Sequence, residues 1–224
     1  MLLSKINSIA VTFFTAIFFG SCAQTTIKQD NQNSIITSIE TTNKPMDTNL
    51  DTITLGAGCF WCVEAVFQNL KGIEKVTSGY SGGFVKNPSY KEVCNGTTGH
   101  AEVCQLLYNP KLITVAEILE VFWQTHNPTT LNQQGNDFGT QYRSAIFYHN
   151  AEQKKIAEFY KAELTKSNAF SAPIVTEIKA FTNFYPAEDY HQNYFNQNGD
   201  QPYCQYVIQP KVEKFKKVFK EKVK

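Results

Sequence analysis

A cysteine lies where a short apolar strand, expected over residues 52–55, gives way to an amphipathic helix. Glycines at positions 56 and 58 allow the backbone to turn at this point. Apolar side chains then recur at helical spacing, which predicts a helix over Val63–Leu70 with one buried face. Cys59 is expected in its first turn, where free N–H groups and the helix dipole favour a thiolate over an ordinary thiol with a pKa of about 8.5. The position therefore predicts a nucleophile.

The first residues of the chain have the pattern of an export signal. Lys5 is their only charge, and the apolar run Ile9–Phe19 is too short to span a bilayer as a helix. Two small residues then precede Cys22, as in bacterial lipoproteins, although the run ends in an aromatic residue where an aliphatic one is usual. Residues 1–21 are interpreted as a lipoprotein-type signal peptide and Cys22 as the lipidation site. An ordinary signal peptide with an incidental cysteine is the alternative.

Two further segments follow the signal. Residues 22–49 are rich in Thr, Asn, Gln, Ser and Ile without helical period, which indicates a flexible tether. Residues 50–224 have the usual length of one domain. Lys and Arg total 21 against 20 Asp and Glu, so no basic excess points to nucleic acid. The chain is expected to be exported to the cell envelope or periplasm, anchored in a membrane by its lipid, and monomeric.

Strand and helix patterns alternate along the domain. Strands are expected over residues 72–80, 100–108, 144–148 and 174–178, and helices over residues 115–124, 151–166 and 211–224. Residues 127–140 are polar and contain glycine, which predicts a long loop of the kind that is usually functional. Interleaved strands and helices with an antiparallel-looking pair favour an α+β or mixed α/β sandwich.

Several polar and aromatic side chains are candidates to act with the cysteine. Phe60 shares the apolar helix face and fits a core position, whereas Trp61 lies off that face and is expected to be exposed as lining for an apolar group. The polar candidates, each unremarkable by itself, are Glu102, Asp137, Tyr142, Tyr90 and His191.

Seven motifs in order resemble those of the A-type peptide methionine sulfoxide reductases. They cover nearly the whole domain and read GCFWC-E, SGYSGG, PSY, GHAEV, NPTT, DFGTQYRS and EDYHQ. The resemblance implies a single catalytic domain of α+β class with a ferredoxin-like α/β sandwich core and extensions. It implies no metal and no organic cofactor, but an external thioredoxin-like thiol reductant. The substrate would be the S-epimer of methionine sulfoxide, either free or bound in proteins or peptides, and the role would be repair of oxidised envelope proteins.

The same resemblance implies a role for each matching residue. Cys59 would be the nucleophile, and Phe60 with Trp61 would form the pocket for the substrate's S-methyl group. The side chains around the sulfoxide oxygen would be Glu102, Tyr90 and Tyr142, with Asp137 supporting them. Physical chemistry agrees, because a sulfoxide resists thiolate attack unless its oxygen is protonated or strongly hydrogen-bonded. A carboxyl group kept protonated by burial supplies that proton, and Cys59 becomes a sulfenic acid.

The resolving thiol is open between two cysteines. Cys204 is the first candidate, on a polar segment expected to be mobile enough to fold back. Cys62 competes because three residues along one helix bring it close to Cys59. Cys62 also stands where the family usually has glycine, as Cys104 stands where valine is usual and Asn127 where Asp is more frequent. The two remaining cysteines, Cys94 and Cys104, are expected to be buried free thiols.

Other classes of protein share parts of this pattern. A thioredoxin-like disulfide oxidoreductase would use Cys59 and Cys62 as its CxxC pair, but no strand beginning with proline lies at the usual distance. A zinc site could use the same pair with His100 and His191, although a single CxxC is weak support for it. A non-catalytic surface lipoprotein would leave the polar side chains unexplained.

Overall fold

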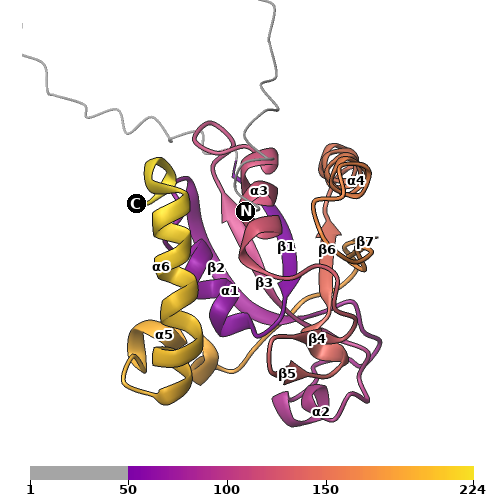
Figure 1. Cartoon of the computed structure of the whole chain (residues 1–224). Coiled ribbons are helices and arrows are strands. Elements are labelled where there is room, and N and C mark those ends of the chain that lie inside the picture. Colours follow the sequence, from indigo (N-terminus) through magenta and orange to yellow (C-terminus); the bar gives the residue numbers. More distant parts are fainter. Residues whose placement is uncertain (1–49) are drawn as a thin grey trace, which may run out of the picture. The chain divides into compact units, whose positions relative to one another are not determined.

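The computed structural model describes residues 50–224 (Figure 1). The predicted signal peptide, the lipidation site Cys22 and the predicted tether lie outside these residues. No helix in the described part of the chain is both long and apolar enough to cross a membrane.

The strands of the described chain are β1 Asp51–Ala57, β2 Ile73–Ser81, β3 Ala101–Tyr108, β4 Gln133–Gln134, β5 Asp137–Phe138, β6 Ser144–Tyr148, β7 Glu177–Ala180 and β8 Tyr185–Pro186. The α-helices are α1 Phe60–Phe67, α2 Tyr90–Cys94, α3 Val115–Thr125, α4 Ala151–Lys166, α5 Tyr194–Gln197 and α6 Gln209–Val218. Short 3-10 turns span Thr140–Tyr142, Asp189–His191 and Lys220–Lys222, and a π-helical turn spans Cys204–Ile208.

The larger sheet has six strands in the order β7-β6-β1-β3-β2-β8. The four central strands pair antiparallel, whereas β7 pairs parallel with β6, so the sheet is mixed. The predicted α+β class with one domain is confirmed. Figure 1 shows α4 and β7 at the opposite edge of the sheet from α5 and α6.

Most predicted elements are present, with shifted ends. The strand at 144–148 and the helix at 151–166 have the predicted bounds. The predicted loop 127–140 contains the small hairpin β4–β5, because Gln133–Gln134 pairs antiparallel with Asp137–Phe138. Because apolar and polar side chains do not alternate in these residues, the sequence does not predict so short a pair of strands.

The two faces of the sheet bury different clusters. On β3, Cys104, Leu106 and Tyr108 belong to the larger cluster, which also contains the buried side chains of α1 and α3. The alternate residues Ala101 and Val103 belong to a smaller cluster on the other face. Side chains of a strand alternate between faces, so Glu102 lies on the face that α1 covers. The strand register thus points a carboxyl group at the cysteine helix.

The turn between β1 and α1 depends on Gly58. Its φ of +91° lies in the region that favours glycine, and a Cβ placed there would lie 2.6 Å from Cβ of Gln134. The Gln134 side chain is held in place, since its Nε2 donates to the carbonyl of Asn127 at 3.0 Å. Both backbone strain and a steric clash therefore require glycine at this turn.

We expect Gly58→Ala to lower the free energy of unfolding by about 3 kcal/mol, from a positive φ and an overpacked contact together. Gly135→Ala is the matched control, because Gly135 has a φ of +61° and a Cβ there would meet nothing within 4 Å in the described chain beyond its sequence neighbours. The control should lose only about 1 kcal/mol. Urea unfolding measures both variants, and equal losses would show that the contact with Gln134 is unimportant.

Candidate active site

Cys59 caps the N-terminus of α1. Its φ of −54° and ψ of 124° are non-helical, and its carbonyl accepts the N–H groups of Cys62 at 3.1 Å and Val63 at 3.4 Å. The thiol lies at the predicted junction of strand and helix but is buried, with 7% of the residue exposed. The Cys59 thiol therefore does not lie on an open face of the molecule, and a substrate sulfur reaches it only past the residues at the surface.

The thiols of Cys59 and Cys62 form a hydrogen-bonded pair with unequal acidities. Burial raises the pKa of the Cys59 thiol well above its ordinary value, and the hydrogen bond with Cys62 raises it further. The hydrogen bond from Cys59 lowers the pKa of Cys62 to about 7, against the effect of burial. The sequence predicts a thiolate at Cys59. The structure favours the protonated thiol, because the effect of burial on its pKa outweighs the effect of the helix N-terminus. With this pKa of about 7 the pair is about half ionised at pH 7, and the hydrogen bond from Cys59 favours the charge on Cys62.

Glu102 is a protonated carboxyl group beside this pair. It is 1% exposed, and burial raises its pKa to about 8. Its Oε2 accepts the backbone N–H of Phe60 at 3.1 Å, which partly opposes the rise, whereas the nearby charges of Asp137 and Cys62 add to it. Most of the Glu102 population therefore carries a proton at pH 7, as a proton donor requires.

Two phenols from different elements share this environment. Tyr90 is the first residue of α2, whose Ser89–Glu92 capping box fixes the helix start, and its N–H donates to Oε1 of Glu188 at 2.9 Å. Tyr142 ends the 3-10 turn that follows β5. Burial raises the pKa of both phenols, and the charge of Glu102 raises both further. Both hydroxyls stay protonated and remain hydrogen-bond donors.

Asp137 is connected to the thiols through a residue that the sequence did not single out. The hydroxyl of Tyr203 donates to Oδ2 of Asp137 at 2.7 Å and lies 3.9 Å from Sγ of Cys62. Tyr203 also contacts the Trp61 ring edge-on, with ring centres 5.9 Å apart. The sequence predicts a role for Cys204 in this segment, yet Tyr203, the residue before it, is the one that contacts the site.

Of the two aromatic residues after Cys59, Phe60 is buried as expected and Trp61 is less exposed than expected. Phe60 is buried, in agreement with its place on the apolar face. Trp61 is half-buried rather than exposed, because Tyr194 stacks on it with ring centres 3.7 Å apart and planes 7° apart. The Trp61 Nε1–H donates to Nδ1 of His191 at 3.2 Å. Tertiary contacts from residues 191–194 therefore hold the indole, which helical spacing cannot reveal.

His191 and Glu64 organise that covering segment. Burial lowers the pKa of His191, and because its Nδ1 accepts from Trp61, the neutral ring carries its proton on Nε2. Glu64 on α1 accepts the N–H groups of Asn193 at 2.8 Å and Tyr194 at 3.2 Å. Glu64 is the glutamate of the GCFWC-E motif. Its fixed place in that motif is the only indication in the sequence of a structural role.

All five cysteines of the described chain are free thiols. Cys204 is fully buried in the π-helical turn, and the expected mobility of its segment stays a prediction. Cys204 is buried because it packs with Ile208 into the main core, which a polar local sequence did not indicate. Cys104 is buried as predicted, whereas Cys94 is half-buried at the end of α2.

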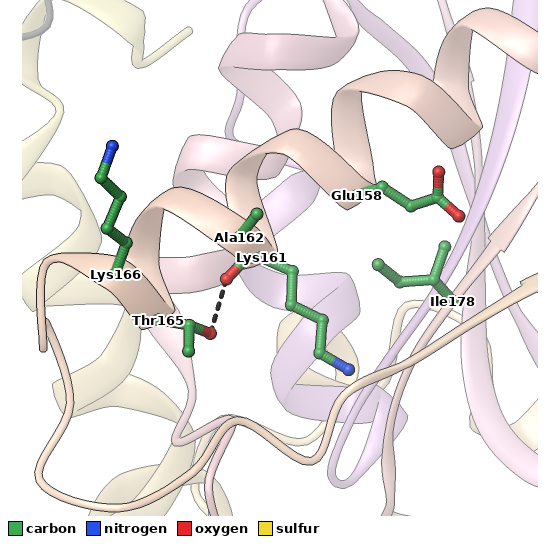
Figure 2. Close-up of a pocket in the computed structure, with 6 residues that line it drawn as sticks. All are labelled: Glu158, Lys161, Ala162, Thr165, Lys166 and Ile178. Atoms are coloured by element: carbon green, nitrogen blue, oxygen red, sulfur yellow. Dashed lines mark hydrogen bonds between the residues drawn. The ribbon is translucent and has the colours of Figure 1, made fainter.

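Two other kinds of site are less well supported. Within residues 50–224 no group of three or more His, Cys, Asp or Glu side chains is placed to hold a metal ion. Figure 2 shows a surface hollow of about 580 Å³ between α4 and β7 that shares no residue with the cysteine site. Its lining residues are Glu158, Lys161, Ala162, Thr165, Lys166 and Ile178.

The site is a buried thiol pair beside a protonated carboxyl group and two phenols, in a domain of the α+β class. These features define a thiol-dependent oxidoreductase. The family described as "Peptide methionine sulfoxide reductase" matches residues 51–223. A peptide methionine sulfoxide reductase MsrA from Leptospira borgpetersenii is 56% identical over 168 residues, covering 75% of this chain and 94% of the relative. One from Saccharolobus solfataricus is 54% identical over 175 residues, covering 78% and 98%.

Solved structures agree with these relatives. The reduced form of Mxr1 from Saccharomyces cerevisiae superposes with a TM-score of 0.63 at 39% identity, covering 69% of this chain and 89% of that one. Methionine sulfoxide reductase A of Corynebacterium diphtheriae has a TM-score of 0.60 at 34% identity, covering 67% and 76%. The chain belongs to the peptide methionine sulfoxide reductase family, A type, and is a peptide-methionine (S)-S-oxide reductase. The predicted family is confirmed.

Proposed function

We propose that Cys59 attacks the sulfur of methionine-S-sulfoxide while Glu102 protonates the sulfoxide oxygen. The observation that carries this proposal is the carboxyl group with a pKa of about 8 beside the thiol pair. Cys62 accepts the Cys59 proton as the attack begins, because the hydrogen bond between them already shares it. Tyr90 and Tyr142 donate hydrogen bonds to the oxygen, and Asp137 acts through Tyr203 and through its effect on Glu102.

The reaction moves one oxygen atom and two electrons. The sulfoxide oxygen ends on Cys59 as a sulfenic acid, and methionine leaves with the electron pair on its sulfur. Phe60 and Trp61 face the S-methyl group of the substrate. Only one epimer can place its methyl group there while its oxygen points to the polar side chains of the site. A single-turnover assay with each sulfoxide epimer tests this assignment. Equal rates for the two epimers would contradict the proposed pocket.

Cys62 is the thiol we propose to resolve the sulfenic acid. Cys62 gives up the proton it took from Cys59, its thiolate attacks Sγ of Cys59, the S–O bond breaks as the disulfide forms, and the hydroxyl leaves as water with that proton. Cys62 already shares a hydrogen bond with Cys59, whereas Cys204 is enclosed in the π-helical turn. The geometry therefore reverses the order in which the sequence places the two candidates. An external thioredoxin-like dithiol would then reduce the disulfide.

Cys62→Ser should retain one equivalent of product and lose at least about tenfold in steady-state turnover with thioredoxin, because its sulfenic acid has no nearby partner thiol. Cys204→Ser is the matched variant and should keep most turnover. Product methionine is measured with and without thioredoxin recycling. Loss of turnover in Cys204→Ser alone would instead make Cys204 the resolving thiol, reached by opening of the π-helical turn. Insulin disulfide reduction by the wild type would support the thioredoxin-like alternative.

Three further assignments complete the proposal. The central strand order β6-β1-β3-β2, antiparallel throughout and connected by α1 and α3, supports a ferredoxin-like core. Residues 1–21 would direct export, and a lipid on Cys22 would hold a monomeric catalytic domain at the cell envelope, where it repairs oxidised proteins. Mass spectrometry of the mature N-terminus tests the lipid, since an unmodified residue there would exclude anchoring by Cys22.

A further inference from the structure

Cys62 and Lys211 line the same small hollow. Its volume is about 10 Å³, and its other lining residues are Ala57, Val63, Val66 and Thr125. Such a volume is close to the smallest that holds one water molecule. Cys62 reaches it from α1 and Lys211 from α6, two helices in contact with each other. The wall is otherwise apolar apart from Thr125, so the side chains of Cys62 and Lys211 border the same small hollow.

The chain geometry places Lys211 there. The π-helical turn Cys204–Ile208 leads directly into α6, and Pro210 occupies its first turn. A π-helical turn carries an extra residue per turn and is found often at functional sites. Cys204 and Ile208 point into the core, and Lys211 follows half-buried one turn later. Lys211 is thus held beside the hollow by a segment whose start is packed into the core.

The charge on Cys62 is surrounded mostly by groups that are neutral or acidic. Those acting on it or responding to it are Cys59 on α1, Glu102 and Cys104 on β3, Asp137 on β5, Tyr203 and Cys204 before α6, and Lys211 on α6. Lys211 is the cation of this group. His126, which also responds to Lys211, has a pKa lowered to about 4 mainly by burial and stays neutral.

We propose that Lys211 is a positioning residue for the resolving step, holding Cys62 as the anionic thiol across the shared hollow. This inference rests on the proposed role of Cys62. An opposite charge within a few ångströms favours an ionised group, and weak solvation makes the effect larger than at a surface. Lys211 favours the anion of the thiol that attacks second, so that Cys62 readily gives up the proton it took from Cys59 once Cys59 is a sulfenic acid.

Lys211→Met tests the inference in the full chain, because it removes the charge and keeps an apolar stem of similar length. Reduced protein is mixed with methionine-S-sulfoxide, and the sulfenic acid formed on Cys59 is followed until the Cys59–Cys62 disulfide replaces it. Rapid alkylation and peptide mass spectrometry give both species from pH 6 to 9. We expect the midpoint of the pH profile for disulfide formation to move upward by about one pH unit. At pH 7 the step should slow about fivefold.

Two control variants separate charge from packing. Lys211→Arg should retain the wild-type midpoint, because the charge stays at the hollow. Lys214→Met removes a neighbouring lysine of α6 whose Nζ contacts the carbonyl of Gln124 at 3.5 Å, and it should change neither midpoint nor rate. A purely structural role for Lys211 would alter rates without moving the midpoint.

The outcomes distinguish this inference from the proposed function. If the wild type forms the Cys59–Cys62 disulfide and Lys211→Met shows an unchanged midpoint, the role of Lys211 is wrong and Cys62 remains the resolving thiol. If the wild type forms a disulfide with Cys204 instead, the assignment of Cys62 fails and the role of Lys211 fails with it. A shifted midpoint in Lys211→Met alone, with rescue in Lys211→Arg, supports the inference.

Discussion

Cys59→Ser is expected to abolish reduction of methionine-S-sulfoxide, with a loss of at least about a thousandfold even when dithiothreitol is in excess. Serine has nearly the same volume as cysteine, so the turn after β1 and the cap of α1 remain. Its hydroxyl, however, is almost entirely protonated at neutral pH and forms no sulfenic acid. The measurement is methionine produced per enzyme molecule, including the first turnover, so that failed recycling cannot be mistaken for failed chemistry.

Cys104→Val is the matched control for this prediction. Cys104 is as deeply buried, on the strand that carries Glu102, and its Sγ donates to the carbonyl of Phe60 at 3.4 Å. Valine fills a similar space, so reduction should continue at a rate within a few-fold of the wild type. Turnover that survived Cys59→Ser but not Cys104→Val would contradict the assignment of the nucleophile.

Glu102→Gln should lower the rate of the first reductive turnover by about 10²–10³, the range expected for loss of a general acid. Glutamine keeps the shape and still accepts the N–H of Phe60, but it has no proton to transfer. The variant should therefore bind substrate while reacting slowly. Single-turnover rates at saturating sulfoxide separate the chemical step from binding.

The pH dependence of the same step gives a second test. The raised pKa of Glu102 means that its protonated, donating form is present below pH 8 and is lost as the pH rises through about 8. The thiol pair gives up its first proton with a pKa of about 7, so activity rises through that value. A narrow bell with its maximum between these values is expected, and Glu102→Gln should lack the alkaline decline. Glu117→Gln, at the capping box of α3, should leave the bell unchanged. An alkaline decline that persisted in Glu102→Gln would assign it to another group.

Much of the site was predictable because its residues lie at the ends of regular elements. Glycines and apolar spacing place Cys59 between strand and helix, and strand alternation places Glu102 on the face toward α1. The motif order also identified the family. These inferences depend on local geometry, which repeats every two residues in a strand and every 3.6 in a helix.

Two features that the sequence did not predict have a common physical origin. Trp61 lies off the apolar face of its helix, yet Tyr194, more than a hundred residues away, covers it. Cys204 lies among polar residues, yet a π-helical turn directs it into the core. Neither contact leaves a periodic signal in the residues that make it.

The sequence by itself determined the family, the α+β class and the place of Cys59 between a strand and a helix, and it predicted Cys59 as the nucleophile. Only the tertiary structure decided which thiol of the pair bears the charge, how deeply Glu102 is buried, and that Tyr203 and Lys211 lie beside Cys62. Spacing along the chain sets which residue types stand at each position. Ionisation depends instead on burial and on charges brought close through space, and the groups that act on Cys62 come from the N-cap of α1, from β5, from Tyr203 before the π-helical turn and from α6.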